Sequence, residues 1–158
     1  MDISAPFFTA LVGKPVAHLW RGHGSAIFIE FGELISTTRM DGTFGPPKGE
    51  LTLMIEWSWR IERPKSIYGG SWSNERRWPK MFEKLNGAKV TNVQTFGEIP
   101  EICVSFSNSL RVLSFMTADG QPEWGIITRT PNIGSLSVRR GALHVEKPTS
   151  NPSFKRDA

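Results

Sequence analysis

The chain has 158 residues, a formal net charge of +4 and one cysteine. A chain of this length fits one domain and buries about two thirds of its unfolded surface, so it needs no disulfide framework or structural metal. No window approaches about 18 consecutive apolar residues, and the start Met-Asp-Ile-Ser-Ala-Pro lacks the basic and apolar parts of a signal peptide. We therefore expect a cytoplasmic protein with no membrane span.

The excess of basic residues raises the question of nucleic-acid binding, because a basic surface attracts phosphate. The basic residues are spread among acidic ones in separate clusters: Arg76, Arg77 and Lys80, then Arg139 and Arg140, then Lys155 and Arg156. We interpret them as a solvated surface. A nucleic-acid interface would require the clusters to meet on one face.

The first third of the chain predicts short strands and a loop. Residues 1–10 fit either a short helix or an extended arm. Strands are predicted at 16–20 and 25–31, with a turn at Gly22-His23-Gly24 between them. The segment 41–49 contains three glycines and two prolines, which indicates an irregular loop.

The run Leu51–Glu62 has the clearest pattern in the chain. Its odd positions are all apolar and its even positions are polar apart from Met54, which is the period of a half-buried strand. A strand of this length would span about 40 Å, so we expect it to bend or bulge near its middle. We assign Trp57 and Trp59 to the core and treat the run as the centre of a sheet.

A helix is predicted after the next strand. Residues 66–72 return as a strand, and Ser73-Asn74-Glu75 then offers an N-cap for a helix at about 76–86. Its apolar positions follow helical spacing and would pack one face on the sheet: Trp78, Met81, Phe82 and Leu85.

The second half is again β in character. Strands are predicted at 89–96, 101–106, 110–117, 123–129 and 135–146, the last folded at Arg140-Gly141. Short turns at Asn108-Ser109 and Asp119-Gly120 predict antiparallel hairpins.

These elements together predict a mainly β fold. We expect an antiparallel β-sandwich or half-open barrel of nine or ten strands with one helix packed on it. Residues 1–147 would form a single domain, and 148–158, which are polar and contain proline, would form a C-terminal tail.

A short internal sequence repeat suggests two weakly repeated β units. The segment from Leu11 to Leu19 and the segment from Leu85 to Val93 share Leu, Gly, Val and an aliphatic residue at identical spacing. Each is followed by an alternating strand, as two related units joined by the helix would be. Chance remains the alternative for so short a match.

The usual catalytic and metal-binding residues form no recognised motif. His18 and His23 lack a third ligand at a metal-binding spacing, and His144 is distant in sequence. Cys103 alternates with apolar neighbours in a strand, which favours a buried thiol over a nucleophile. We therefore expect no metal, no cofactor and no catalytic residue.

Charged and aromatic residues remain as candidates for binding. Glu56, Arg60 and Glu62 share the even face of the central run, and Glu30 would neighbour them. We interpret this stripe as ion pairs on the wet face of a sheet. Among the remaining tryptophans, those that could form a partner or ligand surface are Trp20, Trp72, Trp78 and Trp124.

The string Trp59-Arg60-Ile61-Glu62, followed by Ile67 and Gly70-Ser71, resembles a group of small bacterial domains of unknown function. The resemblance covers about residues 11–72 and includes the Leu-x-Gly-x-x-Val start and Phe31-Gly32. Some members of that group are suspected immunity proteins or other binding modules, so the resemblance implies a protein-binding role. It carries over no catalytic residue.

The function that we predict is a non-catalytic binding module, in one form an immunity-type inhibitor, acting through Trp20, Trp72, Arg60, Glu56 and Glu30. Its partner would be another protein or a small ligand, and a second copy of the chain is a further candidate. The alternative is a lipocalin-like carrier or small enzyme that uses Glu30 and Glu56 inside a barrel. A pocket with two convergent carboxylates would favour that alternative, and a flat aromatic patch would favour the first.

Overall fold

The computed structural model describes residues 2–119 and 123–148, which form eleven strands, two α-helices and one 3-10 turn. In chain order these are α1 (Ala5–Leu11), β1 (Val16–Arg21), β2 (Ile27–Phe31), β3 (Leu51–Ile55), β4 (Trp59–Arg63), β5 (Ser66–Gly70), η1 (Glu75–Arg77), α2 (Trp78–Leu85), β6 (Val90–Phe96), β7 (Glu101–Phe106), β8 (Arg111–Ser114), β9 (Trp124–Thr128), β10 (Ser135–Arg139) and β11 (Ala142–Glu146).

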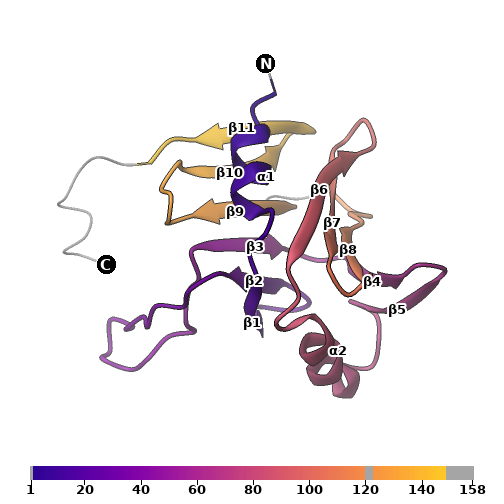
Figure 1. Cartoon of the computed structure of the whole chain (residues 1–158), viewed down its shortest axis with the longest axis horizontal. Helices are drawn as coiled ribbons and strands as arrows, with labels where there is room; N and C mark the ends of the chain where they lie inside the picture. The colour runs from indigo at the N-terminus through magenta and orange to yellow at the C-terminus, as the bar shows by residue number, and fades with distance from the viewer. Residues whose placement is uncertain (1, 120–122, 149–158) are drawn as a thin grey trace.

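The strands form two antiparallel sheets. The six-stranded sheet has the order β1-β2-β3-β9-β10-β11, and the five-stranded sheet has the order β5-β4-β8-β7-β6. Figure 1 shows them as the left and right halves of the molecule. Apolar side chains from both sheets and both helices form one core. The predicted mainly β, sandwich-type fold is confirmed, with eleven strands and an additional helix at the N-terminus.

The central run is divided between the two sheets, so the expectation of one bent strand was wrong. β3 ends at Ile55 in the six-stranded sheet, and β4 begins at Trp59 in the five-stranded sheet. Trp59 is the fourth residue after Ile55, so the even spacing of the alternation continues across the break. The apolar faces of both strands therefore meet the same core, and both side chains are buried. Trp57 lies in the connection and is only half-buried, which corrects its assignment to the core.

The two halves of the chain repeat one topology. The first unit consists of α1 and β1–β5. The second unit consists of α2 and β6–β10, and β11 follows it as an additional strand. In each unit three strands stay in one sheet and the next two cross to the other, so β3 pairs with β9 and β8 pairs with β4. The crossings are hydrogen-bonded to each other: Glu56 N–H donates to the Glu123 carbonyl and Phe115 N–H donates to the Ser58 carbonyl, both at 2.9 Å.

The two matching segments of the internal sequence repeat lie where the two units meet. Gly13 follows α1 and Gly87 follows α2, with φ values of 88° and 87°. Gly13 N–H donates to the Val90 carbonyl, and Gly87 N–H donates to the Val16 carbonyl, both at 2.8 Å. Each turn therefore supplies a hydrogen bond to the first strand of the other unit. The two glycine turns of the shared sequence pattern therefore occupy corresponding places in the two units.

Two tryptophans occupy equivalent places in the repeat. Trp59 opens β4 and donates its indole N–H to the Ser25 carbonyl at 2.8 Å. Trp124 opens β9 and donates to the Pro100 carbonyl at 2.9 Å. Each acceptor lies just before the second strand of its own unit, β2 or β7. Trp124 is fully buried, so it belongs to the core and not to a partner surface.

The predicted helix forms as η1 followed by α2, and it packs on the first unit. The side chain of Asn74 accepts from Arg76 N–H and caps η1. The buried Trp78 ring meets the Trp59 ring edge-on at a centroid distance of 5.0 Å, so Trp78 is also a core residue. A Cβ at Gly69 on β5 would collide with Met81 Sδ, which shows how closely α2 approaches the sheet.

The N-terminal segment, for which the sequence fits either a helix or an extended arm, forms the helix α1, which packs against β6. Neither helix of the described residues is long and apolar enough to cross a membrane. Residues 149–158 of the predicted tail, including the basic pair Lys155 and Arg156, lie outside the described residues. The two other basic clusters lie on different elements, one on η1 and the start of α2 at the bottom of Figure 1 and the other on the β10–β11 hairpin at its top.

The paired turns generate a matched prediction. Gly13→Ala and Gly87→Ala should each lower the free energy of unfolding by about 1–2 kcal/mol, because a Cβ is disfavoured at positive φ while the space around both positions is open. Chemical denaturation measures both. Val12→Ala, at an exposed neighbouring position, should change stability by less than about 0.5 kcal/mol. Alanine variants as stable as the parent would show that the turns do not require the left-handed backbone.

Trp59→Ala tests the junction of the divided run. We expect it to lower the free energy of unfolding by about 3–5 kcal/mol, the range for truncating a buried aromatic side chain. A denaturant melt that matches the parent protein would contradict this assignment of Trp59 to the core.

Candidate functional site

The predicted binding residues separate into distinct places. Trp20 and Glu30 lie together on the outer face of the six-stranded sheet, joined by a hydrogen bond. Arg60 and Trp72 line one recess beside the five-stranded sheet. Glu56 stands alone in the connection between β3 and β4. The structure thus brings the five residues together as two pairs and one separate residue.

Glu30 is buried, which corrects its place in a charged stripe on a wet sheet face. Its side chain has 0% exposure. One carboxylate oxygen accepts from the Trp20 indole N–H at 2.8 Å. The other accepts from Gly49 N–H at 3.0 Å and from the Thr52 hydroxyl. Arg129 Nη1 lies 3.9 Å from this second oxygen and supplies the countercharge.

Trp20 is half-buried and belongs to the same network. Its ring stacks on Phe28 with centroids 3.9 Å apart. The Lys48 ammonium lies 4.3 Å from the Trp20 ring centre. Burial lowers the pKa of Lys48, and the negative charge of Glu30 opposes that change. Trp20 and Glu30 therefore hold β1, β2 and the loop before β3 together.

Glu56 does not converge with Glu30. Glu30 pairs with Thr52 on β3, and Glu56 lies about 13 Å further along the chain direction. Glu56 is half-buried in the crossing between the sheets. A site that needs both carboxylates in one cavity therefore has no geometric support here.

A recess beside β4 and β5 combines apolar and aromatic groups. Its volume is about 430 Å³. The lining residues are Ser58, Trp59, Arg60, Ile67, Gly70, Ser71, Trp72, Ser73, Phe115 and Thr117. We call this the Trp72 recess. Trp72 is 94% exposed and Ile67 is 60% exposed. A large aromatic and a large aliphatic side chain therefore face solvent at the same place.

The backbone around Trp72 is held on both sides. Ser71 N–H donates to the Trp59 carbonyl at 2.9 Å, and Ser73 N–H donates to the Gly70 carbonyl at 3.0 Å. The Ser73 hydroxyl in turn accepts from Gly70 N–H at 3.0 Å. The exposed indole is therefore carried on a fixed turn.

Basic side chains border the recess. The Arg60 guanidinium lies 4.2 Å from the Phe115 ring centre. Glu62, which is nearly buried, accepts from Arg60 Nε at 2.7 Å and from Arg111 Nη2 at 2.6 Å. One carboxylate thus serves two arginines, so this part of the sheet face keeps a positive charge.

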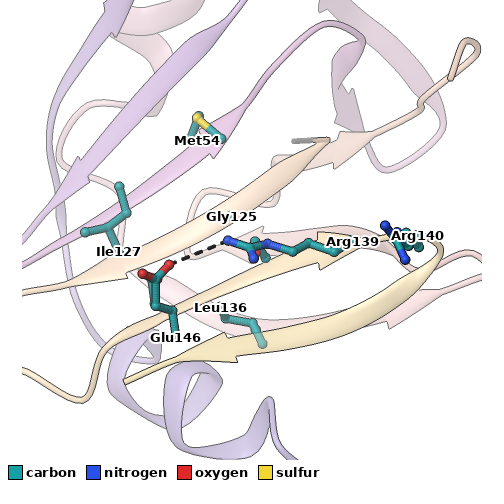
Figure 2. Close-up of a pocket in the computed structure, with 9 residues that line it drawn as sticks. Met54, Gly125, Ile127, Leu136, Arg139, Arg140 and Glu146 are labelled. Carbon is teal, nitrogen blue, oxygen red and sulfur yellow. Dashed lines mark ion pairs between the residues drawn. The ribbon is translucent and has the colours of Figure 1, made fainter. Parts of the chain in front are cut away.

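A second cavity lies on the outer face of β3, β9, β10 and β11 (Figure 2). Its volume is about 480 Å³, and it is lined by Met54, Gly125, Ile127, Ser135, Leu136, Ser137, Arg139, Arg140 and Glu146. Sequence reasoning treated Arg139 and Arg140 as a solvated basic cluster and Arg140-Gly141 as a hairpin turn, and it missed this site. The alternation of β3 and β10 predicts which side chains face outward, but not that β3 and β9 are neighbours.

The remaining chemical candidates have structural explanations. Cys103 is buried on β7, and burial raises the pKa of its thiol against a smaller opposite effect of the Arg111 charge. Among residues 2–119 and 123–148, no group of three or more His, Cys, Asp or Glu side chains could hold a metal ion.

No family model, curated protein or solved structure matches the chain. The resemblance of residues 11–72 to small bacterial domains therefore stays a prediction from short motifs.

The two carboxylates predicted as binding residues should differ in their effect on stability. Glu30→Gln should lower the free energy of unfolding by about 2–4 kcal/mol, because it leaves a buried network without its charge. Glu56→Gln is the matched control and should cost less than about 1 kcal/mol. Denaturant melts of the two variants provide the measurement, and equal costs would contradict the separation of their environments.

Cys103 should react slowly in the native protein. A maleimide reagent added near neutral pH should label it only after denaturant is added, because the thiol is buried and its raised pKa disfavours the thiolate. Mass spectrometry follows the labelling. Complete modification of the folded protein within seconds would reopen the interpretation of Cys103 as a nucleophile.

Proposed function

We propose that this protein is a non-catalytic binding module that docks another protein on the Trp72 recess. The observation that carries the proposal is the exposed Trp72 indole on a turn whose backbone is held by hydrogen bonds. An anchor whose backbone is already ordered loses less entropy on binding than one on a free loop. Tryptophan and arginine are also the residues that most often dominate the energy of protein interfaces.

The chemistry of the recess indicates the kind of partner. Trp72, Ile67 and Phe115 would contact an apolar projection of the partner. The nearby charges are mainly positive, from Arg60 and Arg111 and from the turn after β4 with its exposed basic residues, against the single carboxylate of Glu62. A partner surface with an apolar centre and acidic edges therefore fits best.

An immunity-type inhibitor of a toxin protein is the specific form of this function that the resemblance of residues 11–72 adds. It would act by covering a surface of its target, which requires no catalytic group. The alternative of a carrier or small enzyme depends on Glu30 and Glu56, and the first of these is committed to Trp20, Gly49 and Thr52.

Paired variants test the docking surface. Immobilised parent protein and Trp72→Ser should be compared for capture of proteins from native lysate, and the protein that distinguishes them should then be purified and titrated. We expect Trp72→Ser to bind it about 30-fold more weakly, as for an interface residue worth about 2 kcal/mol. Its melting temperature should equal that of the parent, because the side chain is exposed.

Met40→Ser is the matched control, since Met40 is 92% exposed on the loop before β3. It should bind as the parent does. Equal binding by Trp72→Ser, or loss of binding in Met40→Ser alone, would overturn the proposal. Sedimentation of the parent and Trp72→Ser over a range of concentrations shows whether a second copy of the chain is the partner.

A further inference from the structure

We propose that the second cavity, on the outer face of the six-stranded sheet, binds a small amphiphilic anion: an organic acid whose apolar body lies on the sheet and whose charged group meets Arg139. We call this the β9–β10 cavity, with the nine lining residues given above. Its volume of about 480 Å³ lies in the range of small-molecule sites. It shares no lining residue with the Trp72 recess.

The floor of the cavity exists because Gly125 has no side chain. Gly125 on β9 is the direct neighbour of Met54 on β3 and of Ser137 on β10. A Cβ there would lie 3.1 Å from the Leu136 carbonyl, 3.7 Å from Ser137 Cβ and 4.0 Å from Met54 Cε. The glycine therefore leaves a flat gap between two side chains, and the exposed Ile127 lies two positions further along β9 on the same face. These groups offer an apolar bed.

The other unit carries an arginine at the corresponding position. Arg60 follows Trp59 in β4 as Gly125 follows Trp124 in β9, and each is the second residue of a strand that crossed from the other sheet. The Arg60 side chain extends over Phe115. The cavity is therefore a feature of one unit and does not follow from the shared fold.

Arg139 extends across the cavity. It pairs with Ala142 at the turn end of the β10–β11 hairpin, whereas Glu146 pairs with Ser135 at the opposite end. The Arg139 guanidinium nevertheless reaches to 3.6 Å from the Glu146 carboxylate. Figure 2 shows this side chain lying along the strand beside Gly125. The guanidinium therefore lies over the outer face of the sheet, beside the apolar groups.

The Arg139–Glu146 contact leaves the guanidinium able to bind an anion. Both side chains are more than half exposed, and their 3.6 Å separation exceeds the 2.7–2.9 Å that is typical of charge-assisted hydrogen bonds. Exposed pairs of this kind contribute little to stability. A carboxylate, sulfonate or phosphate group on the ligand can engage the guanidinium through two parallel hydrogen bonds.

Arg140 supplies a second positive charge. Arg140 and Gly141 have φ values of 52° and 75°, the paired left-handed geometry of a tight hairpin turn. This turn sets the direction in which the Arg140 side chain leaves the strand, and Arg140 lines the cavity. Two guanidinium groups against the one carboxylate of Glu146 give the cavity a net positive charge, which selects an anionic ligand over a neutral or cationic one.

A pair of dyes tests the charge and the bed separately. Anilinonaphthalene sulfonate and the uncharged N-phenylnaphthylamine share an apolar body and become fluorescent in apolar surroundings. We expect the sulfonate to bind the parent protein more tightly than the neutral dye. Arg139→Gln should weaken sulfonate binding about tenfold, because it removes the positive charge and the paired N–H donors of the guanidinium. The affinity for the neutral dye should not change.

Two further variants separate the cavity from the rest of the surface. Ser137→Leu places a side chain over Gly125 and should weaken both dyes, whereas Trp72→Ser should bind both as the parent does. Thermal melts confirm that each variant is folded, and Arg139→Gln, at an exposed position, keeps the test decisive if Ser137→Leu does not fold. The proposal is overturned if the parent binds neither dye, if Arg139→Gln binds the sulfonate unchanged, or if Trp72→Ser abolishes binding.

Discussion

The paired crossing of the chain between the two sheets is the constraint on which the rest of the structure depends. Two segments cross side by side and are hydrogen-bonded to each other, from Glu56 to Glu123 and from Phe115 to Ser58. Neither unit completes a sheet alone, because each sheet contains three strands from one unit and at least two from the other. The core can therefore form only when both units are in place. The reciprocal bonds of Gly13 and Gly87 fix the same relationship at the ends of the helices.

This exchange of strands explains where sites can arise. The inner faces of both sheets and the helix stripes are committed to one shared core, so the two units must be similar there. The outer faces are free to differ, and they diverge at equivalent positions. Arg60 covers its sheet face and lies on Phe115, beside the exposed Trp72. Gly125 leaves its sheet face open beneath Arg139. The two proposed sites are therefore different uses of one repeated surface.

Sequence reasoning was wrong where residues distant in sequence decide the environment. Glu30 alternates correctly with its neighbours, which indicates the outer face of a strand. It is nevertheless buried, because Gly49 from the loop before β3, Thr52 from β3 and Arg129 from the second unit close around it. Trp20, a predicted binding residue, is half-buried, and its ring and indole N–H contact Phe28 and Glu30, which its residue type alone does not indicate.

The sequence by itself determined the mainly β class, the strand faces and the helix with its apolar stripe, because these follow from periodicity. It suggested the repeat through the glycines at the ends of the two helices. Only the tertiary structure decided that the run Leu51–Glu62 serves two sheets. Alternation records which face of a strand meets apolar surroundings, and both halves of that run meet the same core. The pattern is thus identical for one strand or two. Which strands become neighbours, and hence where the Trp72 recess and the β9–β10 cavity lie, depends on pairing between distant segments that no local pattern contains.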